Sequence, residues 1–365
     1  MRSSPCACLA LLACIPVLSW AQPTPAPVAD PSQPPTAPAS QAPAPATKNA
    51  EGRIHLDVVV TDPSGRPISG LDLNDFTLLD NNQPGKILSF HAIDGVVQKA
   101  HPPVEIILLI DTVNEWHQQV AFARQEIAKF LSQNGGHLAQ PVSLFVFTRD
   151  GLDAQRLPSA DGNALAVKVD QIDDTLRGVG ARGGSWGAIE LFQRSIKTMM
   201  DIADSEAKKP GRKLLIWVGP GWPLLTSPHI DVSYQGQQQS LDMIAKLSTK
   251  LREARIAAYS ISAGNPVQGT YTYKDYLGGV KSVAKASPSD LGLKVLAVQS
   301  GGRVVGPDND LTSQINNCVQ DAGVFYTLSF DPPPAGHANE YHDLKVQIDK
   351  PGLTARTNTG YYNQP

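Results

Sequence analysis

The chain has 365 residues, with 31 Lys and Arg against 34 Asp and Glu and a formal net charge of −3. This length corresponds to about two domains of ordinary size, ~150 residues each. The near balance of charge argues against a nucleic-acid-binding protein, which would carry a basic surplus or stripe. Three of the four cysteines lie within the first 14 residues, so Cys318 stands alone in the rest of the chain and a disulfide framework is excluded.

Residues 1–21 are predicted to be a cleaved export signal. Arg2 gives a positive start, residues 9–18 are apolar apart from one proline, and a Ser-Trp-Ala sequence then offers a cleavage site before Gln22. The apolar run is too short to span a bilayer, and no later stretch reaches the ~18 apolar residues that spanning requires. The alternative is lipoprotein processing at Cys14, because the residues before it resemble a lipobox.

Residues 22–50 form a segment with nine Pro and eight Ala among 29 residues and almost no charge. This composition has no periodicity and nothing to bury, which is typical of an extended, partly polyproline II spacer. A disordered tail without a spacing role is the alternative.

Residues 51–101 are expected to be antiparallel β structure. Apolar residues alternate over part of 54–61, and a turn signal at 62–65 is followed by further short apolar runs. Such closely spaced short strands are typical of an antiparallel sheet.

From residue 102 to 322 strands and helices alternate. The run VEIILLI at 104–110 is apolar throughout, as in a strand buried on both faces. Further strands are expected at 142–147, 214–218, 256–261 and 303–305, and helices at 120–131, 189–200, 241–251, 289–299 and 310–321. This alternation predicts an α/β fold, a Rossmann-like, doubly wound and mostly parallel sheet with helices on both faces. Cys318 falls on the apolar face of the last helix and is expected to be buried.

Residues 323–365 return to β structure. Strands are expected at 324–330, 344–348 and 353–362. Neither terminal β segment has enough strands to be stable alone, so we expect the two to pair into one β-sandwich-like domain with the α/β unit inserted between them.

The central unit, whose first strand ends in Asp111, resembles a von Willebrand factor type A domain. Four stretches carry a closer resemblance, to the secreted von Willebrand A-related family abundant in Acidobacteria. They are VVVTDPSGRPISGLDLNDFTLLDNNQP (58–84), LLIDTVNEW (108–116) with ARQEIAKFL (123–131), RKLLIWVGPGWP (212–223) and YTLSF…GLTARTNTGYY (326–362). The resemblance implies the α/β fold and a secreted or periplasmic, cell-envelope location.

Type A domains build a metal site from three loops, and here these loops have lost ligands. The D-x-S-x-S loop reads Asp111-Thr112-Val113-Asn114-Glu115, in which Val113 cannot ligate and Glu115 replaces a hydroxyl. Ser185 stands for the Thr of the second loop, and Gly219 replaces the Asp of the third. We expect no metal and no cofactor, with Mg²⁺ or Ca²⁺ held by Asp111, Glu115 and Ser185 as the alternative. Asp111 and Ser185 are then expected to cap the helices that follow them.

Other motifs are weaker. The sequence Gly183-Gly184-Ser185-Trp186-Gly187 matches a nucleophile elbow, and the glycines from residue 178 to 183 match a dinucleotide loop, but neither follows the buried strand that its motif requires. His337, Glu340 and His342 lack a metalloprotease spacing and are expected to lie in a solvated turn.

Aromatic residues give the better indication of function. Trp116, Trp186 and Trp222 fall in loops or helix starts on the face that carries Asp111, and the loops there are long. Such a face is typical of a protein or glycan contact, unless the rings anchor their own loops. We therefore predict a secreted, non-enzymatic binding or adhesion protein; the alternatives are a serine hydrolase using Ser185 and a structural component of the cell envelope. The predicted binding residues are Asp111, Asn114, Glu115, Trp116, Ser185, Trp186 and Trp222.

Overall fold

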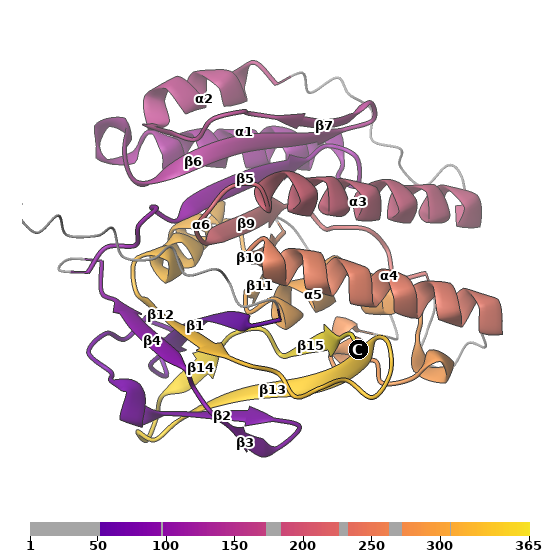
Figure 1. The fold of residues 1–365 in the computed structure, drawn as a ribbon. Coiled ribbons are helices and arrows are strands. Elements are labelled where there is room, and N and C mark those ends of the chain that lie inside the picture. Colours follow the sequence, from indigo (N-terminus) through magenta and orange to yellow (C-terminus); the bar gives the residue numbers. More distant parts are fainter. Residues whose placement is uncertain (1–51, 96–97, 173–183, 226–232, 263–271, 307) are drawn as a thin grey trace, which may run out of the picture. The chain divides into compact units, whose positions relative to one another are not determined.

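The central sheet has the strand order β11-β10-β9-β5-β6-β7, with β8 also paired to β6. The structure is a computed structural model, and it describes residues 52–365 except 96–97, 173–183, 226–232, 263–271 and 307 (Figure 1). The strands are β5 (Glu105–Asp111), β6 (His137–Thr148), β7 (Gly151–Ala154), β8 (Ser159–Asp161), β9 (Lys213–Val218), β10 (Ile256–Ile261) and β11 (Val304–Val305). All are parallel except β7 and β8, which pair antiparallel with β6. The doubly wound, mostly parallel sheet predicted from the sequence is confirmed.

Helices cover both faces of this sheet (Figure 1). On one face lie α1 (His117–Leu131), α2 (Gly162–Asp170) and α6 (Leu311–Val319), and on the other α3 (Gly184–Glu206), α4 (Tyr234–Glu253) and α5 (Leu293–Gln299). Alternate side chains of β5 enter the two cores, because successive residues of a strand point to opposite faces. Ile106, Leu108 and Ile110 pack on the α1 side, and Ile107 and Leu109 on the α3 side. Short 3₁₀ turns complete the described elements: η1 (Leu73–Asp75), η2 (Gln133–Gly136), η3 (Tyr273–Tyr276), η4 (Val283–Lys285), η5 (Pro288–Leu291) and η6 (Gln320–Ala322).

The terminal segments form two further antiparallel sheets, in the orders β14-β1-β12-β4 and β15-β13-β2-β3. Their strands are β1 (Ile54–Thr61), β2 (Phe76–Asp80), β3 (Gln83–Gly85), β4 (Ser89–Ile93), β12 (Phe325–Phe330), β13 (Glu340–Ile348), β14 (Thr354–Arg356) and β15 (Gly360–Asn363). β1 lies between β12 and β14, with Ile54 opposite Phe330 and Val60 opposite Ala355. Apolar side chains of both sheets share one core. The predicted pairing of the two terminal β segments is therefore confirmed.

Buried charges join these sheets to the α/β unit. Asp321 is fully buried and accepts hydrogen bonds from the Tyr259 hydroxyl of β10 at 2.8 Å and from Arg356 of β14 at 2.7 Å. Arg255, just before β10, makes an ion pair with Asp57 of β1 at 2.5 Å. Removing one partner of either pair would leave the other charge uncompensated in its buried setting, which is costly. Residues 49–365 accordingly form one compact unit.

Cys318 lies in the core beneath α6, as predicted, and its exposed fraction is 0%. Burial raises the pKa of its thiol to about 12. The thiol is therefore protonated at neutral pH and acts as a small apolar side chain.

Two parts of the α/β unit differ from the sequence prediction. The helix expected over 289–299 is split into η5 and α5 by Gly292, whose backbone is extended. β7, β8 and α2, which were not predicted, follow β6. Among the described residues no helix is both long and apolar enough to cross a membrane.

The isolated segment 51–100 is expected not to fold. The neighbours of β1 are β12 and β14, and β4 pairs with β12, so the fragment retains only the β2–β3 pair. A single hairpin is at best marginally stable in water. Circular dichroism during heating should show no cooperative transition for the fragment, whereas the whole chain should show one. A cooperative transition in the fragment would contradict the strand order.

Candidate functional site

The carboxyl ends of the parallel strands form the candidate site. The chain passes from β5 to β6 on one side and later returns to β9 on the other, so the strand order reverses between β5 and β9. Ligands of open α/β sheets bind in the crevice that such a reversal leaves. Asp111 is the last residue of β5 and therefore lies at this point.

The Asp111 carboxylate is buried, with an exposed fraction of 1%, and surrounded by donors. One oxygen accepts from the backbone N–H groups of Val113 (3.0 Å) and Asn114 (2.9 Å). The other accepts from the Asn114 amide and from the Trp217 indole N–H, both at 2.9 Å. Burial raises the pKa of Asp111, and these four hydrogen bonds oppose that rise. Asp111 thus holds the β5–α1 turn; α1 has Trp116 as its N-cap, so the prediction that Asp111 caps this helix is wrong.

Trp217 reaches Asp111 from the neighbouring strand, β9. Its ring is fully buried and packs edge-on against Phe147 and Trp222, with ring centroids 5.8 and 5.4 Å away. A buried indole needs a partner for its N–H, and Asp111 provides one. The sequence showed Trp217 only as one residue of an apolar strand, and no local pattern paired it with Asp111.

Asn114 links this turn to α3. Its amide also donates to the Ser195 hydroxyl at 3.1 Å, and Ser195 is fully buried. Asn114, one of the predicted binding residues, therefore holds the loop to the helix.

The residues do not fit a type A metal site. All four hydrogen bonds to Asp111 come from protein donors, and Val113 is a buried apolar residue. At Gly219 the backbone φ is +150°, and a Cβ atom there would lie 2.7 Å from the Cβ of Asp111. The aspartate of the third loop could not be accommodated. Within the described part of the chain no three acidic, His or Cys side chains are grouped to hold a metal.

Glu115 lies beside this centre and is half-buried. Burial raises its pKa to about 7, and the charge of Asp111 adds to that rise, while the Trp116 backbone N–H opposes it by donating at 3.1 Å. Near neutral pH Glu115 therefore exists in both protonation states.

The tryptophans of this face divide into two groups. Trp116 and Trp186 are 69% and 82% exposed. Trp222 is 5% exposed and donates its indole N–H to the Leu291 carbonyl at 3.1 Å, so it anchors its own loop and offers no surface to a partner. Tyr234, which sequence reasoning passed over, is 72% exposed at the first residue of α4. Its place at the start of a helical pattern could have indicated an exposed ring on this face.

Ser185 lies in the first turn of α3, and its side chain is outside the described residues, as is Gly183. His342 was expected in a solvated turn, and this is wrong. It lies in β13 with an exposed fraction of 5%, its Nδ1 is 2.7 Å from an Asp80 oxygen, and its ring stacks on Tyr361. Glu340 begins the same strand, and its carboxylate lies 3.7 Å from the His342 ring.

No protein-family model and no curated protein matches the sequence. Three solved structures illustrate the distant structural likenesses. The conserved hypothetical protein BatB from Bacteroides thetaiotaomicron is 13% identical, with a TM-score of 0.34, over 60% of this chain and 98% of that one. Manganese-loaded TRAP from Plasmodium vivax is 11% identical, with a TM-score of 0.33, over 74% and 97%. The pilus adhesin SpaC from Lactobacillus rhamnosus GG is 9% identical, with a TM-score of 0.36, over 80% of this chain and 48% of that one. The central unit has a type A-like fold by its own sheet order and helix layers.

Asp111→Asn is expected to lower the free energy of unfolding by about 1–3 kcal/mol, the usual cost of disturbing a buried hydrogen-bonded group. The new amide would place a donor where donors already converge. Urea denaturation at pH 7.5 measures the loss. Glu115→Gln is the matched control, because it changes a carboxyl group of the same turn that accepts the Trp116 backbone N–H, in place of the four donors of Asp111. Equal effects of the two variants would contradict the role given to Asp111.

Divalent metals are expected to leave the melting temperature unchanged. A ligand that binds only the folded state adds about 2.7 kcal/mol of stability at a hundredfold excess over its dissociation constant. Because the residues around Asp111 do not fit a metal site, no such stabilisation is expected. Melting curves in Mg²⁺, Mn²⁺ or Ca²⁺ at millimolar concentration should overlie the curve in EDTA. A metal-dependent rise that Asp111→Asn abolishes would show that the site does bind a cation.

Proposed function

We propose that this chain is an exported, non-enzymatic binding protein that contacts a protein or glycan partner. The contact is made by the rim, which is the set of exposed rings Trp116, Trp186 and Tyr234 around the carboxyl ends of the parallel strands. The exposure of Trp116 and Trp186 carries the proposal. The centre of the edge is closed by the Asp111–Trp217 hydrogen bond, so the contact is assigned to the surrounding rings.

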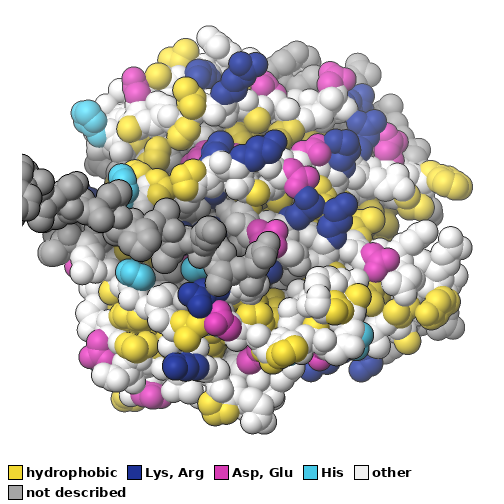
Figure 2. Space-filling model, in the orientation of Figure 1, with side chains coloured by type: hydrophobic (Ala, Val, Ile, Leu, Met, Phe, Trp, Pro, Cys, Tyr) yellow, Lys and Arg dark blue, Asp and Glu magenta, His cyan; other side chains and the backbone are white. Residues whose placement is uncertain are grey.

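The exposed rings share one end of the molecule. Trp116 is the N-cap of α1, Trp186 lies in the first turn of α3, and Tyr234 is the first residue of α4. These helices begin where the parallel strands end, so their amino ends lie on the same edge of the sheet as Asp111. Figure 2 shows apolar side chains standing out at the free ends of α3 and α4.

Exposed tryptophans are suited to recognition. A Trp or Tyr ring brings a large apolar area together with a polar group, and such rings are enriched among the residues that dominate binding energy. They also lose little conformational freedom on binding, having two side-chain torsions. The half-buried carboxyl group of Glu115 directly precedes Trp116 and adds a polar group to this contact.

The proposal includes export. Its support is the amino-terminal sequence, with a positive start, a short apolar run and small residues before Gln22. The two terminal β sheets are joined to the α/β unit by the Asp57–Arg255 and Asp321–Arg356 pairs. The Pro/Ala-rich segment, residues 22–50, would space the folded part from the surface to which the chain is delivered.

The double variant Trp116→Ala/Trp186→Ala is expected to lose partner binding by at least tenfold while keeping its fold, because both rings are mostly solvent-exposed. The chain without residues 1–21 is immobilised, and components captured from the cell envelope of the source organism are quantified for each variant. Leu157→Ala is the matched control. Leu157 is 76% exposed, but it lies in the β7–β8 turn, towards the amino-terminal half of β6. Equal capture by the unchanged chain, the double variant and Leu157→Ala would refute binding through the rim.

A further inference from the structure

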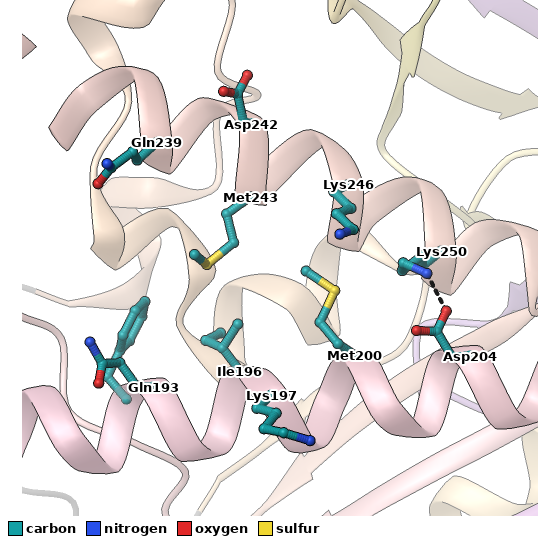
Figure 3. Close-up of a pocket in the computed structure, with 11 residues that line it drawn as sticks. Gln193, Ile196, Lys197, Met200, Asp204, Gln239, Asp242, Met243, Lys246 and Lys250 are labelled. Carbon is teal, nitrogen blue, oxygen red and sulfur yellow. Dashed lines mark hydrogen bonds and ion pairs between the residues drawn. The ribbon is translucent and has the colours of Figure 1, made fainter. Parts of the chain in front are cut away.

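A groove outside the candidate site runs between α3 and α4. It has a volume of about 560 Å³, and Figure 3 shows the side chains that line it from the two helices. Phe192 and Ile196 are buried in its floor, and Met200 and Met243 are half-buried. Methionine side chains are flexible and polarisable, so such a floor adapts to a surface that packs on it.

Charges of both signs flank this apolar floor. On α3 the side chains of Lys197 and Asp204 are 74% and 54% exposed. On α4 Asp242 and Lys246 are exposed and Lys250 is half-buried. Asp201 of α3, 50% exposed, brings the number of acids on the face to that of the lysines. A strongly acidic or basic partner would meet like charge on half of these positions.

We propose that this face binds the same face of a second copy of the chain. A two-fold interface brings one patch against itself and therefore requires self-complementarity. The α3–α4 face is self-complementary when the two-fold axis runs along the groove, parallel to the helices. Each α3 then lies over the α4 of the other copy.

The ion pair between Asp204 and Lys250 shows which turns of the two helices lie side by side (Figure 3). Both helices run in the same direction, because each leads into a strand of the same parallel sheet. One turn back along each helix, Met200 and Asp201 are level with Lys246, and a further turn back Lys197 is level with Asp242.

An axis parallel to the helices preserves these levels across the interface. Asp204 of one copy then faces Lys250 of the other, and Lys197 faces Asp242. Lys246 lies over Met200 and Asp201 of the other copy, so its stem covers apolar surface while its charge meets an acid. Within one copy the hydrogen bonds to Asp242 come from neutral Gln238 and Asn339, at 3.1 and 3.3 Å. Lys197 makes an ion pair with Asp201 of its own helix at 2.5 Å, and the dimer places it between that acid and Asp242 of the other copy.

An axis running across the helices is less favourable. It also sets Lys197 against Asp204, but it brings the two copies of Lys246 together and likewise the two copies of Asp201. Like charges in direct contact destabilise an interface. The charge pattern thus selects the parallel arrangement.

The available area matches a reversible dimer. α3 and α4 have 23 and 20 residues, so the face is about 30 Å long and, at ~10 Å a helix, about 20 Å wide. Roughly 600 Å² from each copy is towards the lower end of the range for specific interfaces. In this dimer the rims of both copies point the same way, so the binding proposed above, if it holds, would be bivalent.

Analytical ultracentrifugation of the chain without residues 1–21, at about 1–100 μM, tests the proposal. The dimer is expected to form with rising concentration and to weaken between about 50 and 500 mM salt, because the contacts around the groove are partly exposed ion pairs. No partner is present in this experiment, so its result does not depend on the function proposed for the rim.

Charge exchange tests the arrangement. Lys197→Asp and Asp242→Lys each create two like-charge contacts by symmetry and should each raise the dimer dissociation constant about tenfold. The double variant restores opposite charges and should return it to within about threefold of the original. Lys345→Asp is the matched control, because Lys345 is exposed on β13, outside the face.

Three outcomes would overturn the proposal. One is a chain that stays monomeric at every concentration in low salt. Another is a pair of single variants no weaker than Lys345→Asp. The last is a double variant weaker than either single one, which would contradict the parallel axis. Thermal melting of each variant confirms that the fold is kept, since exposed ion pairs contribute little to stability.

Discussion

A carboxylate taken out of water needs donors for its oxygens. At Asp111 this requirement organises the loops at the carboxyl ends of the parallel strands. One oxygen fixes the turn after β5 through backbone N–H groups, and the other fixes β9 through the Trp217 indole. Leu109 pairs with Trp217 in the sheet, so the hydrogen bond and the strand register support each other. Asn114 extends the same network to α3. Gly219 is required because a side chain there would collide with Asp111. The carboxylate that the sequence offered as a cation ligand thus holds a turn, a strand and a helix together through hydrogen bonds.

Most of the fold could be predicted from patterns that report burial. The apolar runs now seen as β5, β9 and β10 are strands covered on both faces, and the helix periodicities of α1, α3 and α4 mark their buried sides. β7 and β8 escaped prediction because they have four and three residues, none of them buried, and so leave no apolar run. α2 has nine residues, and only a few apolar residues form its buried side. Gly292 interrupts the predicted helix with an extended backbone, and a side chain there would press on Leu224, a tertiary contact that no local pattern shows.

The site was harder to predict than the fold, because its chemistry depends on contacts between distant residues. The sequence placed Asp111 at a strand end and predicted that the loops around it lack ligands of a type A metal site. It could not show that Trp217, 106 positions away, would donate to that carboxylate. It treated Trp116, Trp186 and Trp222 alike, although the last ring is buried against Trp217. His342 reads as a polar residue near a turn, yet Asp80 and Tyr361 from neighbouring strands enclose it.

The place of β1 has a consequence for how the chain is made. Thr327 bonds to Asp57 across 270 residues, and β14 follows later still. At a synthesis rate of ~5–20 residues per second, β1 therefore waits roughly 15–50 seconds for the strands that will enclose it. Throughout that interval an apolar strand with both edges open is a template for association with other chains. The strand therefore stays open until roughly the last forty residues of the chain have been made.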